Sequence, residues 1–158
     1  MKKLLTGLSA ATFAAVTLLA SGAMADGHLE KAIKARQAQM ALYSFNLGQL
    51  GAIAKGQADY DAKVAAAAAA NLLAVAKIDG AAMWPQGSDD EAMPGKTRAL
   101  KKAWTTYPAV VENQKQLLEA LEAMNAAAGK DLESLQGAMG GVGKACGACH
   151  KAFRAEKS

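Results

Sequence analysis

From residue 29 onward, apolar side chains recur every three or four positions, which is the spacing of one face of an α-helix. Clusters of glycine, proline and small polar residues divide this pattern into four segments, at about residues 29–55, 59–78, 97–127 and 131–158. No segment alternates apolar and polar residues as a half-buried strand does. Four helices joined by mostly short links predict an all-α fold, an antiparallel up-down-up-down four-helix bundle.

The boundaries of these helices have local causes. Gly56 ends the first helix, and the carboxylates of Asp59 and Asp61 favour a new helix start. The connection at residues 83–95 contains two prolines and two glycines, which exclude a helix there. Pro108 is expected to kink or restart the third helix.

The last segment carries its apolar residues in an unbroken series at helical spacing, and both cysteines of the chain belong to that series. Its members are Leu132, Leu135, Met139, Val142, Cys146, Cys149 and Phe153. The two thiols are therefore expected on the side of the helix that faces the bundle interior. Any group that they hold would lie inside the bundle.

The chemistry of the chain is concentrated in Cys146-Gly147-Ala148-Cys149-His150. Cys-x-x-Cys-His is the attachment pattern of c-type haem. Thiols three positions apart lie on one helix face and can add to the two vinyl groups of one porphyrin, while His150 binds the iron. The pattern predicts one haem c, attached covalently through two thioethers.

Two other uses of a Cys-x-x-Cys pair are disfavoured. A zinc site built from four cysteines of one chain is excluded, because this chain has only two. A thioredoxin-like redox motif needs a βαβ setting, which the helical pattern does not provide. A glycine-rich stretch at 137–144 is not a phosphate-binding loop, since Ala138 takes the leading glycine position and Ala145 that of the required Ser or Thr.

The N-terminus predicts export. Lys2 and Lys3 precede a charge-free apolar run at residues 4–20, and Ala23-Met24-Ala25 is a small-x-small cleavage site. Residues 1–25 are therefore expected to be a cleaved signal peptide, and residues 26–158 a single domain in the periplasm. A membrane anchor is disfavoured because the run is shorter than the roughly 20 residues needed to span a bilayer.

Composition narrows the range of partners. Without Lys2 and Lys3 the formal net charge falls from +4 to about +2. Basic residues form no run longer than a pair, and only 5% of residues are aromatic, so nucleic acid is not expected as a partner. The only histidine besides His150 is His28, which is expected to be exposed near the start of the mature chain.

The chain resembles the cytochrome c′ family, the class II c-type cytochromes, over essentially all of residues 26–158. In that family the haem motif lies on the last helix of a four-helix bundle. The matching pieces are Arg36-x-x-x-Met40, Ala54-Lys55-Gly56 with Tyr60-Asp61, Trp84-Pro85, Pro94-Gly95-Lys96-Thr97, Trp104, the stretch 142–150 and Arg154. The resemblance implies a single haem c in the core of the bundle.

The resemblance also implies roles for individual residues. Cys146 and Cys149 would carry the haem and His150 would be the fifth iron ligand. The other expected contacts are Arg36 and Gln37 on the first helix, Thr97 near the haem propionates and Arg154 beside the proximal imidazole. Taken without the family, Arg36 and Arg154 could equally be ordinary solvated helix charges, and Thr97 could be a helix N-cap.

Met40 matches the residue that faces the iron from the distal side. In most members of the family an apolar side chain there closes the sixth position, and the five-coordinate, high-spin iron admits nitric oxide or carbon monoxide. In low-spin relatives a methionine binds the iron at this position, which raises the reduction potential and suits electron transfer. The sequence leaves both alternatives open, with Met40 as packing residue or as sixth ligand.

The function expected from sequence is that of a monohaem cytochrome, not an enzyme, that transfers electrons, binds small gases, or does both. Its partners would be periplasmic redox proteins. A low-spin His/Met electron carrier without an open site is the alternative, and a peroxidase is disfavoured because no second histidine lies within the helical body.

A homodimer through the first two helices is also possible from the sequence. The side chains that would allow it are those of Leu42, Phe45 and the alanine run 65–70.

Overall fold

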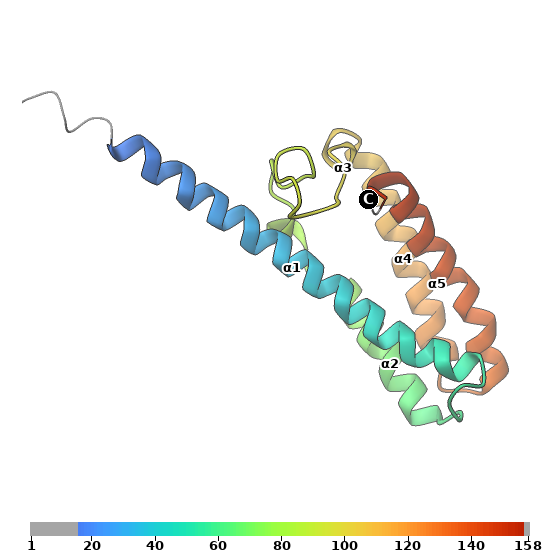
Figure 1. Cartoon of the computed structure of the whole chain (residues 1–158). Helices are drawn as coiled ribbons and strands as arrows, with labels where there is room; N and C mark the ends of the chain where they lie inside the picture. The colour runs from blue at the N-terminus through green and yellow to red at the C-terminus, as the bar shows by residue number, and fades with distance from the viewer. Residues whose placement is uncertain (1–15, 157–158) are drawn as a thin grey trace, which may run out of the picture.

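The computed structural model describes the backbone of residues 16–156 and the side chains of residues 27–156. Its elements are α1 (Val16–Ala54), α2 (Ala62–Ala76), the 3-10 helix η1 (Ala81–Met83), α3 (Lys102–Thr105), α4 (Tyr107–Ala127) and α5 (Leu132–Phe153). The fold is the predicted all-α four-helix bundle, built from α1, α2, α4 and α5 (Figure 1). Most of the expected signal peptide lies outside the described residues, and its cleavage stays a prediction.

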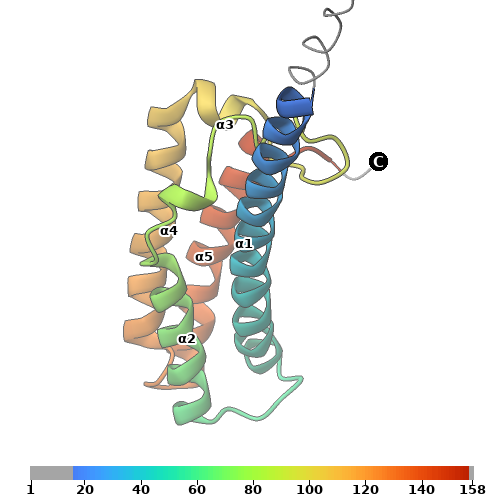
Figure 2. The ribbon, with the colours of Figure 1, turned by 90° about the vertical axis from the view of Figure 1, so that its left-hand side faces the viewer.

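The helices form two antiparallel pairs, α1 with α2 and α4 with α5 (Figure 2). Residues 55–61 and 128–131 connect the pairs at one end of the bundle, here called the turn end. α2 spans only the half of the bundle nearest this end. The long connection between α2 and α3 covers the other half and reaches the opposite end, here called the loop end.

The core lies between the four long helices and is built from small and branched side chains. Its largest fully buried members include Leu50, Leu72, Leu121, Met124, Leu135 and Val142. The alanine run contributes Ala65, Ala68 and Ala69 to the same core. Helices can approach closely where side chains are this small: a Cβ added at Gly129 would lie 3.0 Å from the Cβ of Ala66.

Three predicted helix boundaries are confirmed, and their caps explain them. Gly56 adopts a positive φ of 70°, and two hydrogen bonds close the end of α1 around it, from Gly56 N to Ile53 O and from Gln57 N to Ala52 O. Asp61 caps α2 by accepting hydrogen bonds from the backbone N–H groups of residues 63 and 64. Asp131 caps α5 in the same way through Ser134 N.

The predicted helix from Thr97 was wrong at its beginning. Residues 97–101 are not helical, because their backbone pairs with the chain after α5: Leu100 N donates to Phe153 O and Ala155 N donates to Arg98 O, each at 2.9 Å. This contact also ends α5 at Phe153, short of the expected C-terminus. Pro108 restarts the helix as expected, since α3 ends at Thr105 and α4 begins at Tyr107.

Candidate functional site

The cysteine pair and His150 lie in the last two turns of α5, near the loop end of the bundle. All three side chains are half-buried. Cys146 packs against the hydrophobic core, as the sequence pattern predicts. Both cysteines are free thiols, so no disulfide occupies them.

Burial controls the protonation of these groups. It raises the pKa of the Cys146 and Cys149 thiols, which keeps them in the neutral form. It also lowers the pKa of His150, and the nearby guanidinium groups of Arg154 and Arg98 lower it further. At neutral pH the site therefore offers two reduced thiols and an uncharged imidazole, which is the form of histidine that binds a metal.

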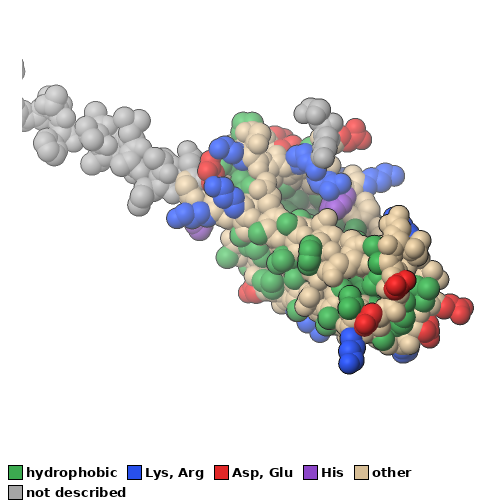
Figure 3. Space-filling model, turned by 60° about the horizontal axis from the view of Figure 1, so that its bottom comes forward, with side chains coloured by type: hydrophobic (Ala, Val, Ile, Leu, Met, Phe, Trp, Pro, Cys, Tyr) green, Lys and Arg blue, Asp and Glu red, His purple; other side chains and the backbone are tan. Residues whose placement is uncertain are grey.

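This donor set fits a covalently attached haem better than a bare metal ion. No cluster of three or more His, Cys, Asp or Glu side chains suited to holding a metal ion occurs among residues 27–156. Two thiols and an imidazole along one side of a helix can instead take both vinyl groups and the iron of a single porphyrin. Figure 3 shows a recess with hydrophobic side chains within it and Lys and Arg side chains around it.

α1 supplies side chains to the same region. The phenol of Tyr43 is half-buried, and this burial, together with the neighbouring Cys146, raises its pKa to about 12. Met40 lies one turn before Tyr43 on α1. Its side chain is 42% exposed, although the apolar pattern of α1 includes it. Whether Met40 binds iron stays a prediction.

Arg36 is a buried residue, only 4% exposed, so the alternative that it is a solvated helix charge was wrong. Its Nη1 donates to Met83 O at 3.0 Å and to Ser88 Oγ at 2.7 Å. Its Nη2 donates to Ser88 O at 2.6 Å and to Thr97 Oγ1 at 3.3 Å. The pKa of Arg36 is lowered by burial, partly offset by the carboxylate of Asp89.

The three predicted residues Arg36, Gln37 and Thr97 come together through these contacts. Gln37 is exposed, and its Nε2 donates to Lys96 O at 2.9 Å. Thr97 Oγ1 accepts from Arg36 and also from Ala99 N at 3.1 Å. Since α3 begins only at Lys102, Thr97 is not a helix N-cap but a turn residue that joins the loop to α1.

Two tryptophans enclose the Arg36 guanidinium. Its Cζ lies 4.6 Å from the ring centroid of Trp84 and 5.6 Å from that of Trp104. The rings are tilted with their centroids 5.5 Å apart, and Trp104 Nε1 donates to Trp84 O at 3.1 Å. The sequence marked both tryptophans but gave no sign of their contact with Arg36, or of Ser88 as its fully buried acceptor.

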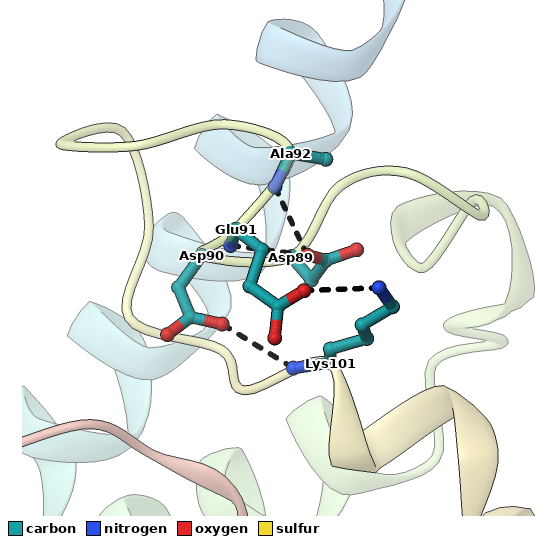
Figure 4. A network of polar contacts seen from close by, with 5 residues as sticks. All are labelled: Asp89, Asp90, Glu91, Ala92 and Lys101. Atoms are coloured by element: carbon teal, nitrogen blue, oxygen red, sulfur yellow. Dashed lines mark hydrogen bonds and ion pairs between the residues drawn. The ribbon is translucent and has the colours of Figure 1, made fainter.

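A second network holds the same loop in shape (Figure 4). The Oδ1 of buried Asp89 accepts from the backbone N–H groups of Glu91 and Ala92, each at 3.1 Å. Asp90 Oδ1 accepts from Lys101 N at 3.3 Å, and the Lys101 ammonium forms a 2.9 Å ion pair with Glu91. The loop is thus anchored to α1 on one side and to the start of α3 on the other.

Two arginines lie near His150. Arg154 is exposed and directly follows α5, and its backbone N–H donates to His150 O at 3.1 Å. Arg98 is half-buried, and its Nη1 donates to Ala155 O at 3.2 Å. The sequence did not single out Arg98, because its position depends on the backbone pairing of residues 98–100 with 153–155.

Comparison with known proteins decides the family. The family model for Cytochrome C′ matches residues 31–154. The chain belongs to the cytochrome c′ family. Cytochrome c-554 of Cereibacter sphaeroides is 39% identical over 132 residues, covering 80% of this chain and 94% of that protein. The solved cytochrome c′ from Rhodobacter sphaeroides superposes with a TM-score of 0.79 at 31% identity, covering 82% and 98% of the two chains.

Two further solved members bear on ligands and assembly. A ferrous variant of the Alcaligenes xylosoxidans protein carries bound nitric oxide; it is 30% identical, with a TM-score of 0.71 over 82% of this chain and 97% of that one. Another cytochrome c′ shows ligand-controlled dimer dissociation; it is 27% identical, with a TM-score of 0.75 over 81% and 97%. Relatives of this chain therefore include a gas-binding protein and a dimer.

Membership of the family makes this chain a monohaem protein of the cytochrome c′ type. The family comprises electron-transfer and gas-binding haem proteins. Within the described residues, no helix is both long enough and apolar enough to cross a membrane. The structure describes the positions of the site residues and not their contacts with haem. The role of each of these residues therefore stays a prediction.

Proposed function

We propose that the chain is a periplasmic monohaem c-type cytochrome that acts in electron transfer, in the binding of small gases such as nitric oxide and carbon monoxide, or in both. The observation that carries the proposal is the pair of half-buried free thiols, Cys146 and Cys149, beside a half-buried imidazole on α5. The predicted signal peptide supports the location, because covalent haem attachment takes place in the bacterial periplasm.

Each residue of the site has a definite task in this proposal. Cys146 and Cys149 fix the porphyrin to α5 through thioethers, and His150 binds the iron as fifth ligand. When bound, the haem supplies an iron that gains or loses one electron and can take a small ligand. The surrounding apolar side chains limit the access of water, which lowers the effective dielectric constant around the haem site. Nearby charges therefore interact more strongly with the haem.

Arg36 has a different task from the one that the family resemblance alone suggests. Both of its terminal nitrogens already donate to Met83, Ser88 and Thr97. A direct bond from these nitrogens to a propionate would require exchange of one of those contacts. We propose that Arg36 mainly holds the loop in place, so that Gln37 and Thr97 lie where the propionates are expected.

The state of Met40 decides between the two activities. If its sulfur binds iron, ferric protein should show a charge-transfer band near roughly 695 nm, which is tied to His/Met ligation. Met40→Ala should then abolish that band and allow carbon monoxide to bind. If the sulfur does not bind, the ferric protein is already high-spin and Met40→Ala mainly admits larger ligands. A spectrum of bis-histidine ligation would contradict both alternatives.

The structure gives no support to a peroxidase. Peroxidase chemistry uses a distal histidine as general acid and base. The only described histidine besides His150 is His28, and its side chain is exposed in the N-terminal part of α1. We therefore propose a non-catalytic role. Substantial peroxidase turnover by the purified holoprotein would contradict it.

We also propose that the chain forms a homodimer through α1. Phe45 is 68% exposed and Leu42 is 48% exposed on the same side of this helix. The alanine run contributes less than expected to such a surface, because Ala65, Ala68 and Ala69 are buried in the chain's own core. Sedimentation of a Phe45→Asp variant should show monomer where the unchanged protein shows dimer. Monomer alone for the unchanged protein at high micromolar concentration would remove this assembly.

A further inference from the structure

Five cations surround the end of α5 that carries the cysteine pair. They are Arg98, Lys102, Lys144, Lys151 and Arg154, and they are called here the α5 cationic surface. All except the half-buried Arg98 are exposed. Lys144 and Lys151 are seven residues apart on α5 and therefore project from the same side of the helix, about two turns apart.

Contacts in the structure bring three of these cations together at the C-terminal end of α5. The pairing of residues 98–100 with 153–155 brings Arg98 beside Arg154. The Lys102 ammonium lies 6.0 Å from the ring centroid of Phe153, the last residue of α5. Arg98, Lys102 and Arg154 therefore lie together, although they come from two segments that are far apart in the sequence. Lys144 and Lys151 continue the surface along the outward side of α5.

These cations are not neutralised within the part of the chain that the structure describes. The three ion pairs found there join Lys77 to Glu122, Lys96 to Glu30 and Lys101 to Glu91. None of them includes a member of the α5 cationic surface. Glu156 is the one described acidic residue on the chain after α5. Unpaired charges of one sign create a potential that attracts and orients partners of the opposite sign.

The turn end of the bundle carries charges of both signs. Its carboxylates lie among lysines from the same three segments; they are Asp59, Asp61, Asp131 and Glu133, and the lysines are Lys55, Lys63 and Lys130. A partner that carries carboxylates would therefore be attracted more strongly to the α5 cationic surface than to the turn end.

The α5 cationic surface adjoins the haem attachment site. Cys149 and His150 lie between Lys144 and Arg154 in the sequence, and both are half-buried. The outward positions between the two lysines are Gly147 and Ala148, both exposed and without bulky side chains. A docked protein could therefore reach the backbone of the helix that holds the thioether positions.

We propose that the α5 cationic surface is where an acidic one-electron redox protein docks, and that the electron passes across this surface. The inference rests on the proposed function, since it needs the haem. One electron leaves the reduced protein and enters the oxidised one. No bond forms or breaks, and no other co-reactant is required.

The test compares charge reversal at this surface with the same reversal at the turn end. One variant carries Lys144→Glu with Lys151→Glu, and the matched control carries Lys63→Glu with Lys130→Glu. Ferrous holoprotein is mixed with ferricyanide, an anion, or with tris(phenanthroline)cobalt(III), a cation, and the oxidation rate is followed. At low salt we expect the α5 variant to react several-fold more slowly with ferricyanide and several-fold faster with the cobalt complex.

The salt dependence of the rates and the control variant decide which results would overturn the docking proposal. The differences should disappear near 1 M salt, where the Debye length is about 3 Å, and the control rates should change less than twofold. Equal changes in both variants would mean that only net charge matters and would overturn the proposal. Unchanged rates in the α5 variant would place electron exchange elsewhere, and tight binding of the unchanged protein to phosphatidylglycerol vesicles would point to a membrane surface in place of a protein.

The haem content of each variant separates this inference from the proposed function. A pyridine haemochrome assay on every sample shows whether one haem is present. If the unchanged protein lacks haem, the proposed function fails; if all samples contain it and the rates do not separate, only the docking inference fails. Lys144→Gln with Lys151→Gln is the milder substitute if the glutamate variant does not mature, and half the effect is expected from it.

Discussion

Arg36 shows most clearly how a single residue shapes the loop beside the site. A buried guanidinium with four hydrogen bonds and two tryptophan faces cannot be replaced by a group of different shape. We expect Arg36→Gln to lower the free energy of unfolding by about 3 kcal/mol, because it leaves buried acceptors without donors.

Two further variants test the cause of this effect. Arg36→Lys keeps the charge but cannot reach the same acceptors in a fork, so most of the loss should remain. Lys34→Gln, an exposed position two residues earlier on α1, is the matched control and should change stability little. Urea unfolding measures all three. A stability of Arg36→Gln equal to that of the control would show that the network contributes nothing.

Tyr43 makes stability depend on alkaline pH. Its pKa is raised from 10.0 to about 12, first by burial and then by the free Cys146 thiol, and the effect of burial does not require that thiol. Above pH 10 the phenol ionises in the unfolded chain but not in the folded one. Stability is therefore complete below about pH 10 and falls as the pH rises toward 12. Tyr43→Phe should show a smaller loss between pH 9 and pH 11 in urea unfolding of the holoprotein; an unchanged loss would contradict this origin.

Residues whose role follows from local chemistry were predictable, and those whose role follows from distant contacts were not. The spacing of Cys146, Cys149 and His150 fixes their place on one helix before any tertiary contact is known. Ser88 and Arg98 gave no comparable signal. Ser88 matters because Arg36, far away in sequence, donates to it, and Arg98 matters because its segment pairs with the chain after α5.

The same distinction holds for the helices. α2 and α5 begin at the side-chain caps Asp61 and Asp131, so their starts followed from the sequence. α1 ends just before Gly56 as predicted, but its predicted start at residue 29 was wrong, since the helix begins at Val16. The segment 97–101 has a helical pattern but forms hydrogen bonds to residues 153–155. A backbone partner from another element then replaces the local helix bonds, and periodicity alone does not reveal such a partner.

Helix ends offer a prediction with an internal control. Gly56 has a φ of 70°, which a residue with a Cβ rarely adopts, so Gly56→Ala should destabilise the protein by about 1 kcal/mol. Gly137 lies inside α5 at an exposed position where an added Cβ meets nothing within 4 Å. Gly137→Ala should therefore stabilise by up to about 1 kcal/mol. Thermal unfolding in which the two substitutions shift Tm in the same direction would contradict this reading.

At the scale of the whole molecule, the loop end and the turn end have different tasks. The turn end contains the side-chain caps of α2 and α5 and the close alanine packing, which stabilise the helices and their contacts in the bundle. The loop end gathers Arg36, the tryptophan pair, the cysteine pair and the α5 cationic surface from segments spread over most of the chain. The predicted chemistry is therefore concentrated at the loop end, where the Arg36 network also contributes to stability.

Electron transfer and gas binding by this chain both depend on one covalent haem. The most direct measurement is the intact mass of periplasmically matured protein under denaturing conditions, beside that of a variant carrying Cys146→Ala with Cys149→Ala. We predict that the unchanged protein weighs one haem more than its polypeptide and that the variant carries none. A stable, colourless unchanged protein with the mass of the polypeptide alone and a disulfide between Cys146 and Cys149 would contradict the account.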